Sequence, residues 1–545
     1  MGGASGEGAV PGDEDAVLGS GSCEDLVVRE SADVDGVASD EPKVSGQAAD
    51  HLVGDPSGRG HDPPYVARRN SLWVKYEGPS RPDVSPAPRL FGTNGIREVV
   101  GTTLTAPFVT RVAAAIASVA PTGRPVAVGW DGRTSSVPFA RIVSSTLALA
   151  GHRVVELGLL PTPAIQYSVP RLGAGLGVIV TASHNPPEFN GIKCIAADGL
   201  EVPRGVEEGI ESAVEAGATP AASYAGVGEV ADDHQGAPRY IEGILAQVDR
   251  ERIVARRLTV VLDCGNGASA VTSPALLRRL GCRVVTLNGR VDGTFPGHLS
   301  EPVESNLADL LHSVPAAGAD LGVAHDGDAD RAVFVDATGR YVPGDEMLTL
   351  LAQEAVTRAR GGIVVTPVST SRSVEETVAP LGGKVVYTRV GSPSVTHEMK
   401  VRGAVFGGEG NGGMVFPAFQ LARDGAMALA ATLDLLARRG GSLADALHGL
   451  PRYTLLKETV ACPTEVRGAV LRTVTEAARA SGDRVETIDG VKIYSHNGWV
   501  LLRPSGTEPL FRIFAESKDP SRARALADRG IAAVEEALAQ TKGAG

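Results

Sequence analysis

The sequence predicts an α/β protein with three similar βαβ-based domains on mixed sheets and a smaller C-terminal α+β domain, arranged around one central cleft. Three observations carry this prediction. A chain of 545 residues is too long for a single core. A strand, Gly/Ser turn, helix and strand recur three times. Each repeat is then followed by a conspicuous polar loop at the end of an apolar strand.

The N-terminal segment 1–85 is predicted to be a disordered acidic tail. It carries 16 acidic and seven basic side chains, whereas the remaining 460 residues carry a net charge of only −3. No basic stripe stands out, so we expect no nucleic-acid partner. No apolar run approaches the ~20 residues of a membrane span, and the five scattered cysteines suit a reducing compartment. We therefore expect a cytoplasmic protein that does not bind a membrane.

The first repeat begins with the strand 126–130 and a Gly/Ser loop. An apolar helical stretch, 139–150, and a second strand after Gly151 complete it. The pattern returns at 260–285 and at 363–386, and each unit indicates a βαβ element in a mixed or parallel sheet. The predicted domains are 86–248, 249–352, 353–455 and 456–545.

The first polar loop follows a β-branched strand at 176–180 and reads Thr-Ala-Ser-His-Asn-Pro over 181–186. Pro186 and Pro187 end the hydrogen-bonding pattern of the strand, and Asn190-Gly191 is expected to form a turn. Ser183, His184 and Lys193 would then lie on a loop at a strand end, where α/β proteins place their chemistry. The alternative is a polar turn with a surface serine.

The second polar loop, Asp-Gly-Asp-Ala-Asp-Arg, places Asp326, Asp328 and Asp330 at alternate positions. Three neighbouring carboxylates repel one another unless a cation lies among them, and a hard ion with oxygen ligands, preferably Mg²⁺, fits best. A calcium EF-hand is excluded because Arg331 occupies its glycine position and Ala337 its glutamate position. A phosphatase that uses Asp326 as nucleophile remains open, as does an acidic surface turn.

The third loop, 408–413, matches G-x-G-x-x-G, but a strand rather than a helix follows it, which excludes a dinucleotide site. Glu409 and Asn411 suit the vicinal hydroxyls of a sugar, although a flexible hairpin is the alternative. The fourth loop, Arg-Pro-Ser-Gly-Thr-Glu-Pro over 503–509, has the composition of a phosphate cradle, with Arg512 nearby. A plain Pro-Gly turn is the alternative there. The four loops thus offer a serine, a metal site, a site for sugar hydroxyls and a site for a phosphate. Phosphoryl transfer on a sugar phosphate needs these four parts.

These four loops, in this order, resemble the α-D-phosphohexomutase family, which contains phosphoglucomutases, phosphomannomutases and phosphoglucosamine mutases. The resemblance covers roughly residues 89–520, from the motif Phe-Gly-Thr-Asn-Gly-Ile-Arg at 91–97 onward. That motif and the Gly-Glu-Gly-Asn-Gly-Gly form of the third loop look most like the archaeal-type branch.

The resemblance implies a role for each matching residue. Ser183 would be a phosphoserine, and a phosphate oxygen on it would bind one Mg²⁺ per chain together with Asp326, Asp328 and Asp330. Arg97 and Lys193 become candidates for proton transfer or charge stabilisation, and His184 supports the loop, with general base as its alternative role. Some relatives carry a His with an acid/base role at the position of Ser392. In this chain that role must therefore belong to another residue. The implied substrate-binding residues are Arg331, Glu409, Asn411, Arg503, Ser505, Gly506, Thr507 and Arg512.

The implied activity is interconversion of hexose 1-phosphate and 6-phosphate through the phosphoserine and a bisphosphorylated sugar. Phosphoglucosamine mutase and phosphomannomutase/phosphoglucomutase are the leading forms. The alternatives are a Mg-dependent sugar phosphatase using Asp326 and a non-catalytic sugar-phosphate-binding protein. We expect a hexose phosphate as partner and a monomer or homodimer.

Overall fold

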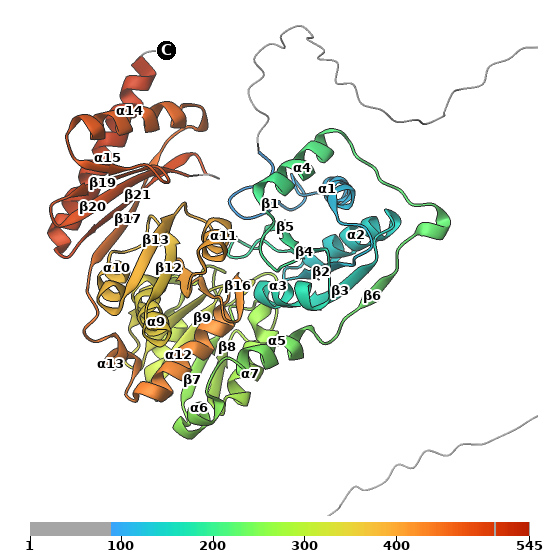
Figure 1. Cartoon of the computed structure of the whole chain (residues 1–545), viewed down its shortest axis with the longest axis horizontal. Coiled ribbons are helices and arrows are strands. Elements are labelled where there is room, and N and C mark those ends of the chain that lie inside the picture. The colour runs from blue at the N-terminus through green and yellow to red at the C-terminus, as the bar shows by residue number, and fades with distance from the viewer. Residues whose placement is uncertain (1–88, 506–507, 544–545) are drawn as a thin grey trace, which may run out of the picture. The chain divides into compact units, whose positions relative to one another are not determined.

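The structure is a computed structural model that describes residues 89–505 and 508–543 (Figure 1). The predicted acidic tail and two predicted phosphate-binding residues, Gly506 and Thr507, lie outside the described residues. The described chain forms one six-stranded and three five-stranded sheets. The first three are mixed and carry helices, and the last is antiparallel, which confirms the predicted fold class.

The first sheet has the strand order β1-β5-β4-β2-β3-β6. Its strands are β1 (Ile96–Val99), β2 (Val126–Trp130), β3 (Val154–Leu159), β4 (Leu176–Val180), β5 (Phe189–Ala196) and β6 (Val230–Asp232). The helices of this part of the chain are α1 (Ala106–Val119), α2 (Ser136–Leu149), α3 (Thr162–Arg171), α4 (Arg204–Glu215), α5 (Gly236–Leu245) and α6 (Arg250–Arg256).

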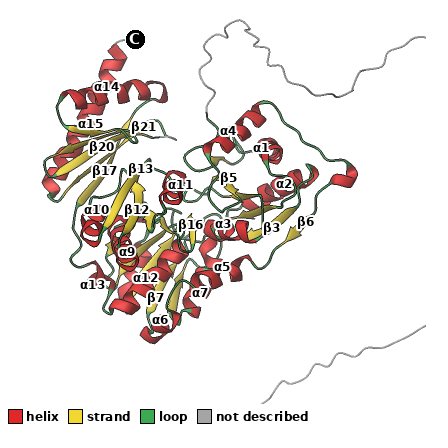
Figure 2. Ribbon diagram, in the orientation of Figure 1, coloured by secondary structure: helices red, strands yellow, loops and turns green. Residues whose placement is uncertain are grey.

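The period-two alternation of the central strands distributes their side chains between two layers of helices. Val126 and Val128 of β2 pack in one apolar cluster with α1 and α2, whereas Ala127 between them packs in another with α3. Helices α2 and α3 accordingly lie on opposite sides of these strands (Figure 2). Helices cover both faces of the first sheet, which explains why the parallel strands β2 and β4 are buried at every position.

The second and third sheets repeat this plan with the orders β11-β10-β9-β7-β8 and β13-β12-β14-β15-β16. The second contains β7 (Thr259–Asp263), β8 (Arg283–Leu287), β9 (Leu321–His325), β10 (Ala332–Asp336), β11 (Tyr341–Val342), α7 (Ser273–Arg279), α8 (Ala308–Ala316) and α9 (Gly344–Ala359). The third contains β12 (Gly362–Pro367), β13 (Gly383–Thr388), β14 (Phe406–Gly408), β15 (Met414–Phe416), β16 (Gln420–Arg423), α10 (Ser373–Val378), α11 (Ser392–Arg402), α12 (Gly425–Arg439) and α13 (Leu443–Leu447). Single-turn 3₁₀ segments occupy Tyr224–Gly226, Ala268–Val271, Glu304–Asn306, Ala379–Leu381 and Thr464–Val466.

The first three polar loops occupy the same topological position in their sheets. Strands β4, β9 and β14 each run parallel to the first strand of their βαβ unit and antiparallel to the next strand along the chain. Each loop therefore lies where the parallel part of a sheet gives way to its antiparallel part. The three loops are structural equivalents, as the sequence repeat predicts.

The predicted turn at Asn190-Gly191 is wrong, because both residues belong to β5. The chain reverses earlier, around the two prolines, and β5 then pairs with β4 on one side and β1 on the other. Lys193 accordingly lies on this interior strand rather than on a loop. Gly191 suits a strand here because a Cβ atom on it would lie 2.1 Å from the carbonyl oxygen of Ile96 and 2.8 Å from that of Thr181.

The fourth sheet has the order β17-β21-β20-β19-β18 and its own core. It contains β17 (Thr454–Ala461), β18 (Arg484–Glu486), β19 (Val491–Ser495), β20 (Gly498–Pro504), β21 (Leu510–Ser517), α14 (Arg467–Ala480) and α15 (Pro520–Gly543). Trp499 and Leu501 of β20 form a small separate apolar cluster with Val368 of the third repeat.

Two sequence expectations about the whole chain can be compared with these elements. Cys194, Cys264, Cys282 and Cys462 are buried and free, as expected, and Cys23 lies outside the described residues. Within the described ranges, no helix has the length and apolar character that a membrane crossing needs.

Substitution of Gly191 by alanine tests the close approach of β5 to β1. We expect Gly191→Ala to destabilise the protein by about 1–3 kcal/mol, the range for overpacking a well-packed site, and to lower the melting temperature. Gly209→Ala in α4 is the matched control, because its new Cβ meets only a Val119 methyl carbon at 3.7 Å. Calorimetric melting should separate the two variants, and equal melting temperatures would contradict the packing described.

Candidate active site

Ser183 is fully buried and has a left-handed backbone conformation, with φ of 53°. A non-glycine residue adopts this conformation only when its surroundings impose it. The Ser183 amide donates to the Thr181 hydroxyl at 2.9 Å, and the Ser183 carbonyl accepts from Ser300 Oγ at 3.2 Å. The loop therefore holds the serine in one orientation.

The Ser183 hydroxyl faces the aspartate loop. Its Oγ donates to Asp326 Oδ2 at 3.0 Å and lies 3.3 Å from His184 Nδ1. Ser300 also connects the two loops, because its Oγ accepts from the Gly327 amide at 3.1 Å. The structure thus brings together the predicted nucleophile and the predicted metal loop, which lie 143 residues apart in the sequence.

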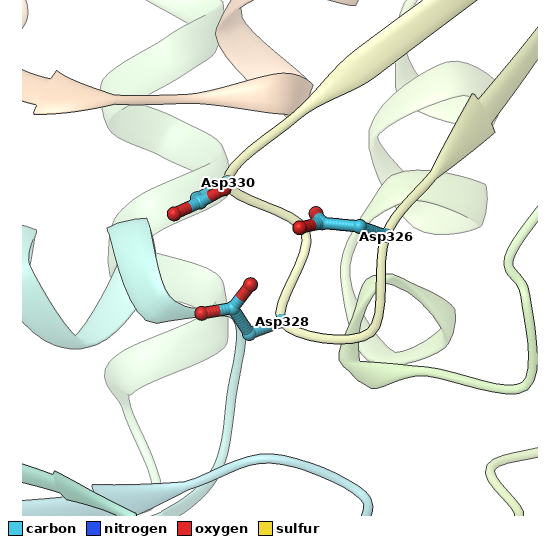
Figure 3. Close-up of side chains that lie close together, drawn as sticks. All are labelled: Asp326, Asp328 and Asp330. Atoms are coloured by element: carbon cyan, nitrogen blue, oxygen red, sulfur yellow. The ribbon is translucent and has the colours of Figure 1, made fainter. Parts of the chain in front are cut away.

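Asp326, Asp328 and Asp330 are all buried, and each offers one carboxylate oxygen within 4.8 Å of the others. All three side chains project to the same side of their loop (Figure 3). Asp328 Oδ1 and Asp330 Oδ1 are buried without a hydrogen-bond partner among residues 89–505 and 508–543. Unsatisfied carboxylate oxygens in this arrangement fit a hard divalent cation, for which oxygen is the preferred ligand.

Cations from two other parts of the chain reach these carboxylates. Lys193 Nζ donates to Asp328 Oδ2 at 2.8 Å, and Arg423 of β16 forms a short ion pair with Asp330. Burial alone would raise the pKa of Asp328, but Lys193, Thr162 and Arg423 together outweigh burial and hold that pKa below its ordinary value. Burial and the two neighbouring carboxylates raise the pKa of Asp326 well above its ordinary value. The ion pair of Asp326 with Arg331 Nε, at 3.7 Å, is longer than those of Asp328 with Lys193 and of Asp330 with Arg423.

His184, Arg331 and Arg97 lie beside the serine. Arg331 Nη2 donates to His184 Nδ1 at 2.9 Å, and Arg97 Nη1 donates to Asn185 Oδ1 at 2.9 Å on the same loop. Burial, together with these two arginines, holds the pKa of His184 well below its ordinary value, so its ring is neutral. Burial also lowers the pKa of Arg97 to about 10.

Glu409 of the third loop is joined to this cluster, whereas Asn411 is not. Arg423 bridges Asp330 and Glu409, and its Nη1 donates to Glu409 Oε2 at 3.0 Å. Glu409 Oε1 accepts from the Gly391 amide at 3.2 Å. Asn411 is exposed, and its side chain accepts a hydrogen bond from the Gly413 amide of its own loop.

The predicted phosphate anchor lies in the fourth sheet. Arg503 Nε donates to Asp489 Oδ2 at 2.5 Å, and the same oxygen accepts from the Val390 amide of the third repeat at 3.0 Å. Ser505 is buried, and its hydroxyl accepts from the Glu508 amide at 3.2 Å. Arg512 is exposed and pairs with Glu508.

Arg133 is a site residue that the sequence reasoning missed. Its fully buried guanidinium donates to four carbonyl oxygens of the serine loop at 2.6–2.9 Å. These carbonyls belong to Ser183, Asn185, Pro186 and Phe189. Asp131 accepts from Arg133 Nε at 3.2 Å and from the Thr181 hydroxyl at 2.7 Å. The signal was present, because Asp131-Gly-Arg133 follows β2, a parallel neighbour of β4, and such strands end at the same sheet edge.

Four models of one family match the chain in order. They describe the α/β/α domains I, II and III and the C-terminal domain of phosphoglucomutase/phosphomannomutase, and they match residues 88–221, 238–339, 343–453 and 461–533. The chain belongs to the phosphoglucomutase/phosphomannomutase family. It is therefore an enzyme, a phosphohexomutase of the isomerase class.

Individual relatives align over nearly their whole length. A phosphoglucomutase/phosphomannomutase of Thermococcus kodakarensis is 39% identical, over 83% of this chain and 99% of that protein. A probable phosphoglucosamine mutase of Methanopyrus kandleri is 40% identical, over 81% and 97% respectively. A crystal structure of a phosphoglucomutase/phosphomannomutase family protein from Burkholderia thailandensis superposes with a TM-score of 0.74 at 27% identity, covering 83% of this chain and 98% of that one.

Arg133→Lys tests whether this guanidinium positions the serine loop. Lysine keeps the charge but cannot span four carbonyl oxygens, so we expect the turnover number to fall about 100-fold, as small misplacements of a reacting group do. Arg111→Lys, an exposed change in α1, is the control and should leave turnover unchanged. If Arg133→Lys stays folded and keeps turnover within a few-fold of the parent, Arg133 does not position the serine.

Proposed function

We propose that this enzyme interconverts the 1-phosphate and 6-phosphate of a hexose by carrying a phosphoryl group on Ser183. The observation that carries the proposal is the 3.0 Å hydrogen bond from Ser183 Oγ to Asp326, inside a cluster of three buried carboxylates. A serine in that position can hold a phosphoryl group next to a cation bound by the aspartates. The names of the relatives support a hexose phosphate as substrate.

We propose Asp326, Asp328 and Asp330 as the ligands of one Mg²⁺. The fit rests on the buried, unsatisfied Oδ1 atoms of Asp328 and Asp330 and on the approach of all three carboxylates to within 4.8 Å of one another. When bound, the ion would neutralise charge on the phosphoryl group. Lys193 and Arg423 complement Asp328 and Asp330 from the other sides.

In the forward half-reaction, the bond between phosphorus and Ser183 Oγ breaks and a bond to a sugar hydroxyl oxygen forms. The hydroxyl proton leaves, with Arg97 and Lys193 as the candidates for its transfer or for stabilising the charge. The bisphosphorylated sugar then turns over, and its other phosphate returns to Ser183. Glu409 and Asn411 are proposed to hold the sugar hydroxyls, and Arg503, Ser505, Gly506 and Thr507 to bind the phosphate that does not react. Arg331, beside the serine, and Arg512 are proposed as further substrate-binding residues.

Ser183→Ala separates this function from a phosphatase that uses Asp326. We expect Ser183→Ala to abolish isomerisation of hexose 6-phosphates. The parent enzyme should gain the mass of one phosphoryl group at Ser183 after treatment with a hexose bisphosphate. Ser118→Ala, an exposed serine in α1, is the control and should keep full activity. Release of free phosphate that survives Ser183→Ala but not Asp326→Asn would overturn the proposal.

Metal removal tests the aspartate site. We expect a chelator to reduce isomerisation at least about 100-fold, with recovery on addition of Mg²⁺, because the phosphoryl charge would lose its counter-ion. Mg²⁺ should also raise the melting temperature of the parent protein, since it binds only the folded site. Mg²⁺ should raise the melting temperature of the Asp330→Asn variant by less than it raises that of the parent. A melting temperature insensitive to millimolar Mg²⁺ in the parent would contradict a site at these residues.

A further inference from the structure

Glu201 is a buried carboxylate that the proposed mechanism does not use. The residue is 8% exposed. Its Oε1 accepts from the Ser392 hydroxyl at 2.8 Å and, more weakly, from Asn94 Nδ2 at 3.5 Å. Its Oε2 is buried and has no hydrogen-bond partner within the described part of the chain. A buried carboxylate with one unsatisfied oxygen is expensive unless a ligand completes it.

The other buried carboxylates near the sugar-binding loop already have cationic partners. Asp328 pairs with Lys193, and Arg423 pairs with both Asp330 and Glu409. Among residues 89–505 and 508–543, no Lys, Arg or His side chain forms an ion pair within 4.0 Å of the Glu201 carboxylate oxygens. Glu201 is therefore the acidic member of this group that lacks a cation, and neutral donors alone compensate a buried charge poorly.

Glu201 lies next to the residues proposed to bind the sugar. Ser392, which holds Glu201 Oε1, directly follows Gly391, whose amide donates to Glu409. The charge of Glu201 also acts on Arg423, where it helps to raise the pKa of the guanidinium against the effect of burial. Two carboxylates from different sheets thus face two successive residues at the start of α11.

The contacts around Glu201 join the first and third sheets. Glu201 follows β5 and bridges back to Ile195, whereas Ser392 begins α11. The Glu201 carbonyl accepts from His397 Nε2 at 2.9 Å, and Lys400 pairs with Asp198 at 2.6 Å. The contacts made by Glu201, His397 and Lys400 are thus polar, and they join two separate repeats beside the residues proposed to bind the sugar.

We propose that Glu201 binds the ammonium group of a 2-amino-2-deoxyhexose phosphate, with Oε2 as its acceptor. An ammonium supplies both the positive charge and the hydrogen-bond donor that this oxygen lacks. The 2-hydroxyl of a neutral hexose supplies only the donor. This inference rests on the proposed function, and it makes aminohexose phosphates the preferred substrates of the enzyme.

Glucosamine 6-phosphate and glucose 6-phosphate form the test pair, because they differ only in the group at carbon 2. For the full-length parent enzyme we expect kcat/KM to be about 10- to 100-fold higher for glucosamine 6-phosphate, the range for one charge-assisted hydrogen bond. This comparison needs no variant. A parent enzyme that converts both sugars equally well, or prefers glucose 6-phosphate, overturns the proposal.

Glu201→Gln keeps the shape of the side chain and removes its charge. We expect kcat/KM for glucosamine 6-phosphate to fall and kcat/KM for glucose 6-phosphate to stay unchanged. The ratio of the two values should then lie within about threefold of one. Glu208→Gln in α4, an exposed carboxylate in the same region, should leave both values as in the parent. An equal loss for both sugars in a variant that melts like the parent would assign Glu201 a structural role instead.

These outcomes are distinguishable from failure of the proposed function. If Ser183 never becomes phosphorylated, or neither sugar is isomerised by the parent, the proposed function itself is wrong. If both sugars are isomerised through Ser183 but Glu201→Gln leaves their ratio unchanged, only the assignment of Glu201 is wrong.

Discussion

The burial of three carboxylates on one short loop is the constraint on which the rest of the site depends. Asp326, Asp328 and Asp330 cannot share a buried loop without positive charge around them. The chain supplies part of that charge from elsewhere, with Lys193 on β5 and Arg423 on β16. The aspartate loop therefore ties the first and third sheets to the second through ion pairs.

Placement of the serine follows from the same arrangement. The strained Ser183 backbone is held from behind by Arg133 and faces Asp326 in front. Arg331, the ion-pair partner of Asp326 at 3.7 Å, is farther away than the closest partners of Asp328 and Asp330, and the serine hydroxyl lies against Asp326. The aspartates proposed to bind the metal and the serine proposed to carry the phosphoryl group are thus adjacent. This proximity links the metal site to the proposed chemistry.

Local patterns predicted the parts of the molecule that are built locally. The repeated strand–turn–helix–strand units and the position of the polar loops depend on short-range periodicity, and the structure contains them. The prediction of a turn at Asn190-Gly191 was wrong because Gly191 allows β5 to pack closely against Ile96 of β1. That contact joins residues 95 positions apart in the chain. Arg423 and Glu201 escaped prediction for the same reason. Each is an isolated charged residue until folding places Asp330 or Ser392 beside it.

The transfer of a labelled phosphoryl group in a single turnover tests the central claim most directly. The enzyme is first phosphorylated at Ser183 with a radioactive phosphoryl group and then mixed with unlabelled hexose 6-phosphate in less than one equivalent. The account predicts that the label leaves the protein and appears in a hexose bisphosphate and then in the product sugar. Label that stays on the protein while the sugar isomerises, or that appears as inorganic phosphate, would contradict it.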